Sequence, residues 1–249
     1  EFAQPALFAV QVGVTRMLAN VGIEPVAVIG HSVGEVAAAW ACGALSLADA
    51  TQVIFHRSRL QGSTRGNGAM TAVGLSGAAS TALLEHLGLS STISVAGHNS
   101  SRGATLAGHP DDLSIAEQHL SAQRIFQKRL DLDYAFHSPA MAPIEQPLRA
   151  ALADLKPVPS RIPFYSAVSG DRIDGAELDA DYWWRNIRER VGFEEAMAAM
   201  VRDGINIYAE VGPHPVLKSY VSDALKIQSI ASRVLVTGQR GDDSPEKIY

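Results

Sequence analysis

A serine between two glycines, in the segment GHSVG, is the first group in this chain that could do chemistry. The preceding VAVI predicts a buried strand, and the Ala-rich run from Glu35 to Ala44 predicts a helix. So tight a turn strains its apex residue and pushes the Ser32 side chain outward, so we expect small neighbours on both sides, Gly30 and Gly34. It also aims the first helix N–H groups, including that of Val33, at the atom under attack. Ser32 is a candidate nucleophile, and the alternative is a serine that only caps a helix.

A nucleophilic serine requires a base, and the chain has eight histidines. His137 in DYAFHSPAM and His214 in EVGPHPVL both fall where a predicted strand meets a predicted helix. Strand ends of α/β sheets meet over a shared crevice, so either histidine could reach the serine. His31 is expected to be a structural hydrogen-bonding residue. Four other histidines are expected to be surface or packing residues: His56, His86, His109 and His119.

An arginine interrupts the apolar face of the helix that follows the Ala-rich one. Arg57 shares three- and four-residue spacings with Val53, Ile54 and other apolar residues, whereas Arg59 projects from another face. A guanidinium in an apolar crevice can bind a carboxylate through two parallel hydrogen bonds. The sequence therefore predicts an anion-binding arginine. The alternative is a buried ion pair with Asp49 or Glu35.

The composition narrows the class of protein. With 249 residues, 47% hydrophobic and 19% charged, the chain can bury a sizeable core. The single cysteine, Cys42, favours a reducing compartment, and no cluster has the spacing of metal ligands. A net charge of −5 without a Lys/Arg-rich stripe argues against a nucleic-acid partner. We find neither an apolar run of about 18 residues nor a signal peptide, so we expect no membrane association and a cytoplasmic location.

The elements that must position these side chains fall into two groups. Up to about Gln61 the pattern is helix, strand, turn, helix and helix, the start of an α/β fold. In residues 67–133 the predicted order changes to strand, helix, strand, strand, helix, strand, which is the ferredoxin-like order. We predict an α/β protein with an α/β-hydrolase-like large subdomain of residues 1–66 and 134–249. Its parallel sheet carries the serine turn, and residues 67–133 form an inserted ferredoxin-like small subdomain.

Further segments follow one another in a recognisable order: GHSVGE, RSRL, GHNSSRGATLAGHPDDL, DYAFHSPAM, RIPFYSAVSG, DADYWWRNIRE and EVGPHPVL. Together they resemble the acyltransferase domains of modular polyketide synthases and the related malonyl transacylases of fatty acid synthesis. The resemblance runs from about Gln4 to Tyr220. An ordered set of this kind is far more specific than GHSVG alone.

The resemblance implies a role for each candidate side chain. Ser32 would attack a thioester, His137 would take its proton, and the Val33 N–H would bind the oxyanion. Arg57 would bind the free carboxylate of a dicarboxylic extender unit, and Asn99 would lie near the pocket. The small subdomain would cover the substrate channel.

The resemblance also bears on the two ends of the chain. His214 would be structural, in a segment whose backbone holds His137 in its working tautomer. Family members usually open with a Gly-Gln-Gly-rich motif whose region supplies a second oxyanion N–H. We expect that motif and the first strand to be missing from this sequence.

The residues before His137 concern the choice of extender unit. Members that resemble malonyl enzymes read His-Ala-Phe-His here, those that resemble methylmalonyl enzymes read Tyr-Ala-Ser-His, and this chain reads YAFH. Phe136 would occupy room that an α-methyl group needs, so sterics favour malonyl. Tyr134 and Phe136 are therefore candidate substrate-binding residues.

We predict a ping-pong acyltransferase that loads an extender unit, preferably malonyl, from coenzyme A onto Ser32. The unit would then pass to the phosphopantetheine thiol of an acyl carrier protein, in polyketide or fatty acid biosynthesis. Expected partners are the carrier protein, the acyl-CoA substrate and neighbouring synthase domains, with no permanently bound cofactor or metal. A Ser–His pair needs only a carbonyl or amide to orient the imidazole, so no acidic third member is expected.

Two other classes of function stay open at this point. An α/β-hydrolase would recruit His214 and an acid, one of Asp174, Asp181 and Asp203. Glu35 directly after the serine turn, the inserted lobe and Arg57 argue against it. The second alternative is an inactive scaffold that docks carrier proteins.

Overall fold

The chain begins with four elements in the expected order, in a computed structural model that describes residues 2–227, 233–239 and 241. They are helix α1 (Ala3–Asn20), strand β1 (Val28–Ile29), helix α2 (Gly34–Ala41) and helix α3 (Leu47–Gly62). Ser46 caps α3, because its side chain accepts a hydrogen bond from the backbone N–H of Asp49. Helices α1, α2 and α3 pack against one another.

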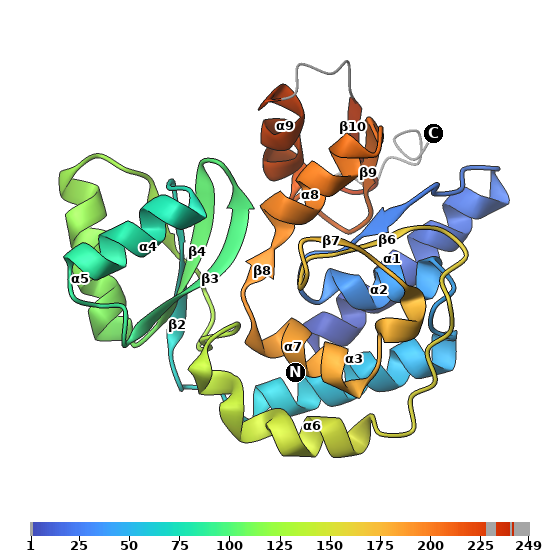
Figure 1. The fold of residues 1–249 in the computed structure, drawn as a ribbon, viewed down its shortest axis with the longest axis horizontal. Helices are drawn as coiled ribbons and strands as arrows, with labels where there is room; N and C mark the ends of the chain where they lie inside the picture. The colour runs from blue at the N-terminus through green and yellow to red at the C-terminus, as the bar shows by residue number, and fades with distance from the viewer. Residues whose placement is uncertain (1, 228–232, 240, 242–249) are drawn as a thin grey trace.

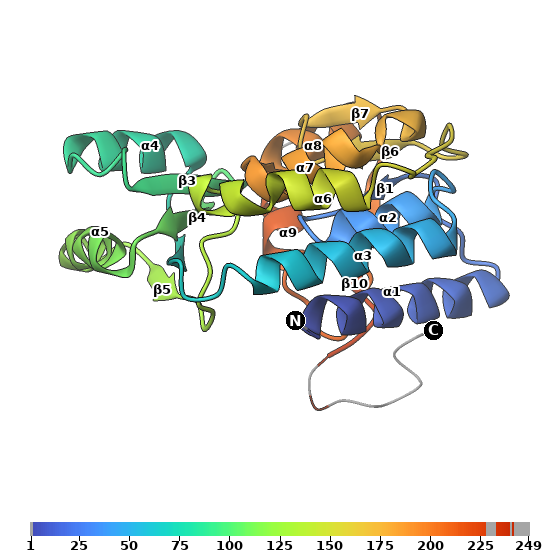
Figure 2. The same cartoon turned by 90° about the horizontal axis from the view of Figure 1, so that it is seen from below.

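The later part of the chain alternates short helices and strands. They are η1 (Pro139–Ile144), α6 (Glu145–Ala151), β6 (Phe164–Ser166), β7 (Asp171–Ile173), η2 (Gly175–Glu177), α7 (Ala180–Arg188), β8 (Val191–Gly192), α8 (Phe193–Arg202), β9 (Ile207–Glu210), α9 (Lys218–Ile227) and β10 (Arg233–Val236). Helices α1, α3 and α6 lie one beside the next (Figure 2). Among the described residues, no helix combines the length and the apolar character needed to cross a bilayer.

Two predicted helices begin differently from the expectation. The helix expected after His137 starts as the 3-10 turn η1, which contains Pro143; Ser138 caps this turn and Pro139 takes its first position. The last helix starts at Lys218 and not at His214. The Glu210 carboxylate accepts hydrogen bonds from the backbone N–H groups of Val216 and Leu217, and these bonds hold that segment in a turn.

Apart from β8, the described strands outside residues 67–133 form two small sheets. Strand β1 pairs in parallel with β6, and β6 pairs antiparallel with β7. Strands β9 and β10 form a separate parallel pair. The large subdomain was predicted to have one parallel sheet, but within the described residues β1·β6 and β9·β10 lie in two separate sheets. The sequence did not predict strands β7, β8 and β10, which contain three, two and four residues.

The third sheet gathers the strands of residues 67–133. The elements there are β2 (Ala69–Val73), α4 (Gly77–His86), β3 (Ile93–Ser100), β4 (Gly103–Gly108), α5 (Pro110–Ala122) and β5 (Gln127–Arg129). The strand order is β5-β2-β4-β3-β8. All pairs are antiparallel except β3·β8, in which the distant strand β8 joins the edge in parallel. These elements lie to one side of the others, and β8 reaches across to them (Figure 1).

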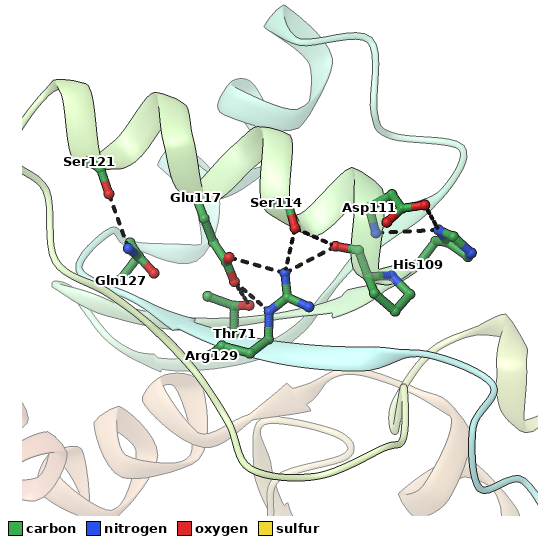
Figure 3. Close-up of polar contacts among 9 residues, drawn as sticks. Thr71, His109, Asp111, Ser114, Glu117, Ser121, Gln127 and Arg129 are labelled. Carbon is green, nitrogen blue, oxygen red and sulfur yellow. Dashed lines mark hydrogen bonds and ion pairs between the residues drawn. The ribbon is translucent and has the colours of Figure 1, made fainter.

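An ion pair fastens α5 to the sheet. Arg129 on β5 donates from Nε to Glu117 Oε1 at 2.6 Å and from Nη2 to Glu117 Oε2 at 3.0 Å. Thr71 on β2 donates to the same carboxylate at 2.5 Å (Figure 3). These donors lower the pKa of Glu117 against the opposing effect of desolvation. The bidentate pairing fixes one helix against two strands.

The buried apolar residues form more than one cluster. One lies under the helices of residues 67–133 and includes Leu106, Leu113 and Leu120. A larger cluster surrounds α2, α3 and α7 and includes Trp183. A small cluster that includes Ala135 lies apart from both, and Phe136 packs against it and against the larger cluster. The segment before His137 therefore sits between two cores.

Candidate active site

Ser32 lies at the turn between β1 and α2 with a φ of 52°, in the left-handed region that non-glycine residues rarely adopt. The two neighbouring glycines differ in what they permit. A Cβ on Gly30 would overlap the backbone of Glu35, so no side chain fits there. A Cβ on Gly34 would meet only Gln11 Nε2, at 3.9 Å. The expectation that both glycines are sterically required is therefore wrong for Gly34.

The first turn of α2 presents an N–H group close to the serine. The N–H groups of Gly34, Glu35 and Val36 donate to the carbonyls three residues before them, at 3.0, 3.1 and 3.2 Å. The N–H of Val33 has no acceptor among the residues that the structure describes. This donor at a helix N-terminus can therefore bind a negatively charged oxygen.

Ser32 Oγ is 2.7 Å from His137 Nε2. His137 has a φ of 58°, and its backbone N–H donates to the carbonyl of Ile187 at 3.2 Å. Its other ring nitrogen, Nδ1, is 2.8 Å from the carbonyl of Glu189. Because a carbonyl only accepts, Nδ1 carries the proton and Nε2 accepts from the serine hydroxyl.

The backbone that orients His137 therefore follows α7 and does not come from the His214 segment, which corrects the expectation. His214 is exposed in a turn. Burial and, to a smaller extent, the Arg57 charge lower the pKa of His137 to about 3, and the hydrogen bond to the Glu189 carbonyl acts in the opposite direction. The imidazole is neutral at pH 7 and can accept a proton.

Arg57 is 2% exposed and donates to several oxygens around it. Its Nη2 donates to Ser32 Oγ at 2.9 Å, and its Nε donates to Asn186 Oδ1 at 3.3 Å. Its Nη1 donates to Gln61 Oε1 at 3.0 Å and also to Gln4 Oε1. Every acceptor in this set is uncharged.

Neither ion pair weighed for Arg57 is formed, and no other carboxylate within the described ranges pairs with it. Asp49 accepts from Ser46 at 2.7 Å. Glu35 acts on Arg57 only at longer range, where its charge raises the Arg57 pKa. Burial is the larger effect and lowers that pKa to about 9, so Arg57 keeps its charge at pH 7.

Glu35 is fully buried beneath the serine turn. Its Oε1 accepts from the backbone N–H of Ala167 at 2.6 Å, and its Oε2 accepts from Tyr182 at 2.8 Å and from Asn186 at 2.7 Å. Desolvation raises the pKa of Glu35 to about 7, and the three donated hydrogen bonds act in the opposite direction. The carboxyl group is thus a buried acceptor for two side chains of α7.

A comparison with protein families decides the identity of this chain. The model of the family described as acyl transferase domain matches residues 1–247. The chain belongs to this family. Within it, the chain falls among the acyltransferase domains of modular polyketide synthases.

Individual relatives agree with that placement. The chain is 39% identical over 238 residues to "Erythronolide synthase EryA2" of Saccharopolyspora erythraea, covering 96% of this chain and 7% of the relative. It superposes on the acyltransferase domain from module 8 of the salinomycin polyketide synthase with a TM-score of 0.94 and 31% identity, over 98% of this chain and 57% of that chain. The SpnD acyltransferase domain, in complex with 2-(pent-4-yn-1-yl)malonyl, gives a TM-score of 0.88 at 28% identity, over 98% of this chain and 58% of that chain.

Asn99 lies on β3 of the acyltransferase domain and links that sheet to the serine turn. His31 Nε2 is 2.8 Å from Asn99 Oδ1, and Asn99 Nδ2 donates to Thr105 at 3.0 Å. Burial lowers the pKa of His31, so its ring is neutral and fits the structural role expected from the sequence. Asn99 therefore contacts the residue next to the serine, not the serine itself.

Tyr134 and Phe136 contact each other. Their rings stack with centroids 4.8 Å apart and an interplanar angle of 12°. No hydrogen bond or ring contact within the described residues links either ring to Ser32 or His137. The structure thus joins Ser32, His137 and Arg57 by hydrogen bonds, whereas the Tyr134–Phe136 ring pair is not hydrogen-bonded to them.

The acids considered for a hydrolase triad are engaged elsewhere. Asp203 accepts from Tyr165 at 2.6 Å, and Asp181 pairs with Arg149. Asp174 caps η2 by accepting from the N–H of Ala176 at 2.8 Å. Among the residues that the structure describes, no acid is hydrogen-bonded to His214, and His214 is not bonded to Ser32.

Sequence reasoning missed Asn186, which is 3% exposed and contacts Ser32, Glu35 and Arg57. The segment DADYWWRNIRE was one of the motifs behind the family resemblance, but no role was predicted for Asn186 within it. An asparagine on the apolar face of a helix was the available signal, since buried amides need partners.

Proposed function

We propose that this acyltransferase domain takes a malonyl unit from coenzyme A and delivers it to the phosphopantetheine thiol of an acyl carrier protein. Arg57 carries the proposal. It is buried and charged, its hydrogen-bond acceptors are neutral, and its Nη2 lies 2.9 Å from Ser32 Oγ. A substrate carboxylate supplies the counter-charge that such a guanidinium lacks. Malonyl carries that carboxylate one methylene away from the thioester carbonyl.

The first half-reaction loads the serine. Ser32 Oγ attacks the thioester carbonyl carbon of malonyl-CoA while its proton passes to His137 Nε2. The Val33 N–H donates to the oxygen that becomes negative. The C–S bond then breaks, and the coenzyme A sulfur takes the proton from Nε2 as it leaves. The product is a malonyl ester on Ser32.

The second half-reaction unloads it. The thiol of the carrier protein's phosphopantetheine arm gives its proton to His137 Nε2 and attacks the ester carbonyl. The C–O bond breaks, Ser32 Oγ recovers the proton, and the malonyl thioester leaves with the carrier protein. The Glu189 carbonyl holds the imidazole in the one tautomer that serves both halves.

The choice of malonyl over methylmalonyl rests on Phe136, whose ring is half-buried and stacked on Tyr134. A phenylalanine takes up volume that an α-methyl group would need. The SpnD domain in complex with a substituted malonyl group supports a malonyl-type acyl group in general. It does not bear on the α-substituent that this chain accepts.

We also propose the division into a large subdomain of residues 1–66 and 134–249 and a small one of residues 67–133 that covers the substrate channel. The separate apolar core of residues 67–133 supports this division. The His31–Asn99 hydrogen bond then crosses the boundary beside the serine.

As the chain spans only 7% of EryA2, neighbouring synthase domains are proposed partners. The single cysteine and the CoA substrate fit the cytoplasm.

A competition experiment tests the function. The protein is mixed with equal concentrations of malonyl-, methylmalonyl- and acetyl-CoA, and its intact mass is measured over time. We expect one malonyl adduct, which disappears when an acyl carrier protein is added, and no adduct on a Ser32→Ala variant. A dominant acetyl adduct, or an adduct that survives in Ser32→Ala, would refute the proposal.

A further inference from the structure

The last turn of α7 touches all three groups of the site. Asn186 Nδ2 donates to the carbonyl of Ser32 at 3.2 Å, and Asn186 Oδ1 accepts from Arg57 Nε at 3.3 Å. Two carbonyls of the same stretch accept from the backbone N–H and from Nδ1 of His137. Residues 186–189 therefore contact the serine, the arginine and the histidine together. Only Asn186 does so through its side chain.

The chemistry of its neighbours dictates which way the Asn186 amide points. The NH₂ group faces two acceptors, the Ser32 carbonyl and Glu35 Oε2, while the oxygen faces the Arg57 donor. A flipped amide would set donor against donor and acceptor against acceptor. With Glu35 as a buried anchor at 2.7 Å, the oxygen of Asn186 is held toward Arg57.

This arrangement decides which part of Arg57 a substrate meets. Arg57 donates from Nε and Nη1 to the amide oxygens of Asn186, Gln61 and Gln4. They orient the guanidinium without cancelling its charge, and they leave Nη2 toward the serine. A carboxylate in the place of Asn186 would compete with the substrate for the same cation.

We propose that Asn186 is a positioning residue that aligns Arg57 with Ser32 and thereby sets the preference for dicarboxylic acyl groups. This inference rests on the proposed malonyl transfer. Asn186 touches no reacting atom. It acts by fixing the angle at which Nη2 meets the acyl group bound beside the serine.

The test compares Asn186→Ala and the isosteric Asn186→Asp with the wild type. Acyl-enzyme formation is measured for malonyl-CoA and acetyl-CoA across substrate concentrations. We expect Asn186→Ala to lower the malonyl-to-acetyl ratio of kcat/KM about tenfold, mainly through a higher KM for malonyl-CoA. Asn186→Asp should lower the ratio further, because its carboxylate pairs with Arg57 internally.

A matched control separates positioning from general support of the fold. Tyr182→Phe removes another donor to Glu35 but leaves the Asn186–Arg57 contact in place. It should reduce thermal stability and keep the malonyl-to-acetyl ratio of the wild type. Folded Asn186 variants with an unchanged ratio would overturn the inference, as would a Tyr182→Phe ratio that falls equally.

The remaining outcomes are equally decisive. If neither Asn186 variant folds, the residue is structural and the inference fails. A wild type that accepts no malonyl group, or prefers acetyl, overturns the proposed function and the inference together. A wild type that prefers malonyl, beside variants that keep this preference, overturns the inference alone.

Discussion

The hydroxyl of Ser32 lies between a buried neutral base and a buried cation. It donates to His137 at 2.7 Å and accepts from Arg57 at 2.9 Å. Desolvation keeps the imidazole uncharged, so Nε2 is free to accept a proton, whereas the guanidinium stays protonated because its pKa falls only to about 9. In the proposed mechanism the two side chains therefore take different roles at one pH, one in proton transfer and one in anion binding.

At this scale Arg57→Ala tests the anion site. Loss of the guanidinium should raise the activation free energy of malonyl loading by roughly 2–5 kcal/mol, because the substrate carboxylate would be desolvated without a partner. Acetyl loading should not slow, since acetyl carries no carboxylate. The measurement is acyl-enzyme formation from each CoA ester, after circular dichroism shows that the variant is folded.

Arg59→Ala is the matched control for that experiment. Arg59 is exposed on the same helix, with its guanidinium over the ring of Phe55. Its removal should change neither loading rate. If Arg57→Ala slowed malonyl and acetyl loading equally, Arg57 would be a structural cation and the dicarboxylic substrate would lose its main physical support.

Two histidine substitutions test which imidazole serves as the base. His137→Ala removes the only imidazole hydrogen-bonded to Ser32 within the described residues, and it should reduce acylation by at least about a hundredfold. His214→Ala alters an exposed turn and should leave the rate within about twofold. Intact-mass measurement of the acyl-enzyme distinguishes the two variants. The reverse pattern would favour a hydrolase.

At the scale of elements, short segments do the positioning. Strand β1 and helix α2 meet at the strained turn that carries Ser32, and the end of α7 supplies the contacts to His137 and Arg57. The apex residue tolerates its φ of 52° because the chain on both sides is held by packing and by hydrogen bonds of the first helical turn. The two glycines of GHSVG have unequal parts in this turn.

Gly30→Ala and Gly34→Ala should therefore differ in sign. The new Cβ at position 30 must displace the backbone of Glu35, which should destabilise the fold by about 3 kcal/mol or more and abolish acylation. The Cβ at position 34 meets only Gln11 Nε2, at an ordinary contact distance of 3.9 Å, so it should stabilise the fold by about 0.4–1 kcal/mol. Urea unfolding measures both. Equal destabilisation would contradict the steric account.

At the scale of the whole molecule, polar contacts join the two groups of elements. The His31–Asn99 hydrogen bond connects the serine turn to β3. Strand β8, which comes from outside residues 67–133, pairs with β3 and forms one edge of the five-stranded sheet. Nearby, Glu195 on α8 accepts from His98 on β3 and from Arg190, and these bonds lower the Glu195 pKa to about 2. Both groups of elements thus contact the serine turn, beside which burial desolvates His137.

That desolvation predicts a pH dependence of stability. The folded pKa of His137 is about 3, below its ordinary value of 6.5, so only the unfolded chain takes up this proton as the pH falls below 6.5. The folded state loses stability progressively from pH 6.5 toward pH 3. Between pH 7 and pH 5 the loss amounts to about 2 kcal/mol.

A His137→Gln variant lacks this proton. Its free energy of unfolding should therefore fall by about 2 kcal/mol less than that of the wild type between pH 7 and pH 5. Urea unfolding of both proteins at several pH values measures the difference, and contributions from all other groups largely cancel. Parallel curves would show that His137 titrates alike in the folded and unfolded chains.

Local patterns in the sequence were enough to predict a mixed α/β fold and the candidates Ser32, His137 and Arg57. A β-branched run, a glycine pair and an Ala-rich stretch specify a strand, a turn and a helix within about 20 residues, and helical spacing placed Arg57 on a buried face. The structure brings these three side chains into hydrogen-bonding contact. The resemblance to the acyltransferase family likewise rests on motifs that are each an unbroken stretch of the sequence.

Only the tertiary structure decided what surrounds them. The carbonyl that orients His137 comes from Glu189, 52 positions away, and the amide that holds Arg57 comes from Asn186, 129 positions away. No periodicity encodes such pairs, because each depends on how distant elements pack. For the same reason the sequence left two ion pairs open for Arg57, whereas packing surrounds it with neutral oxygens and preserves its charge for a ligand.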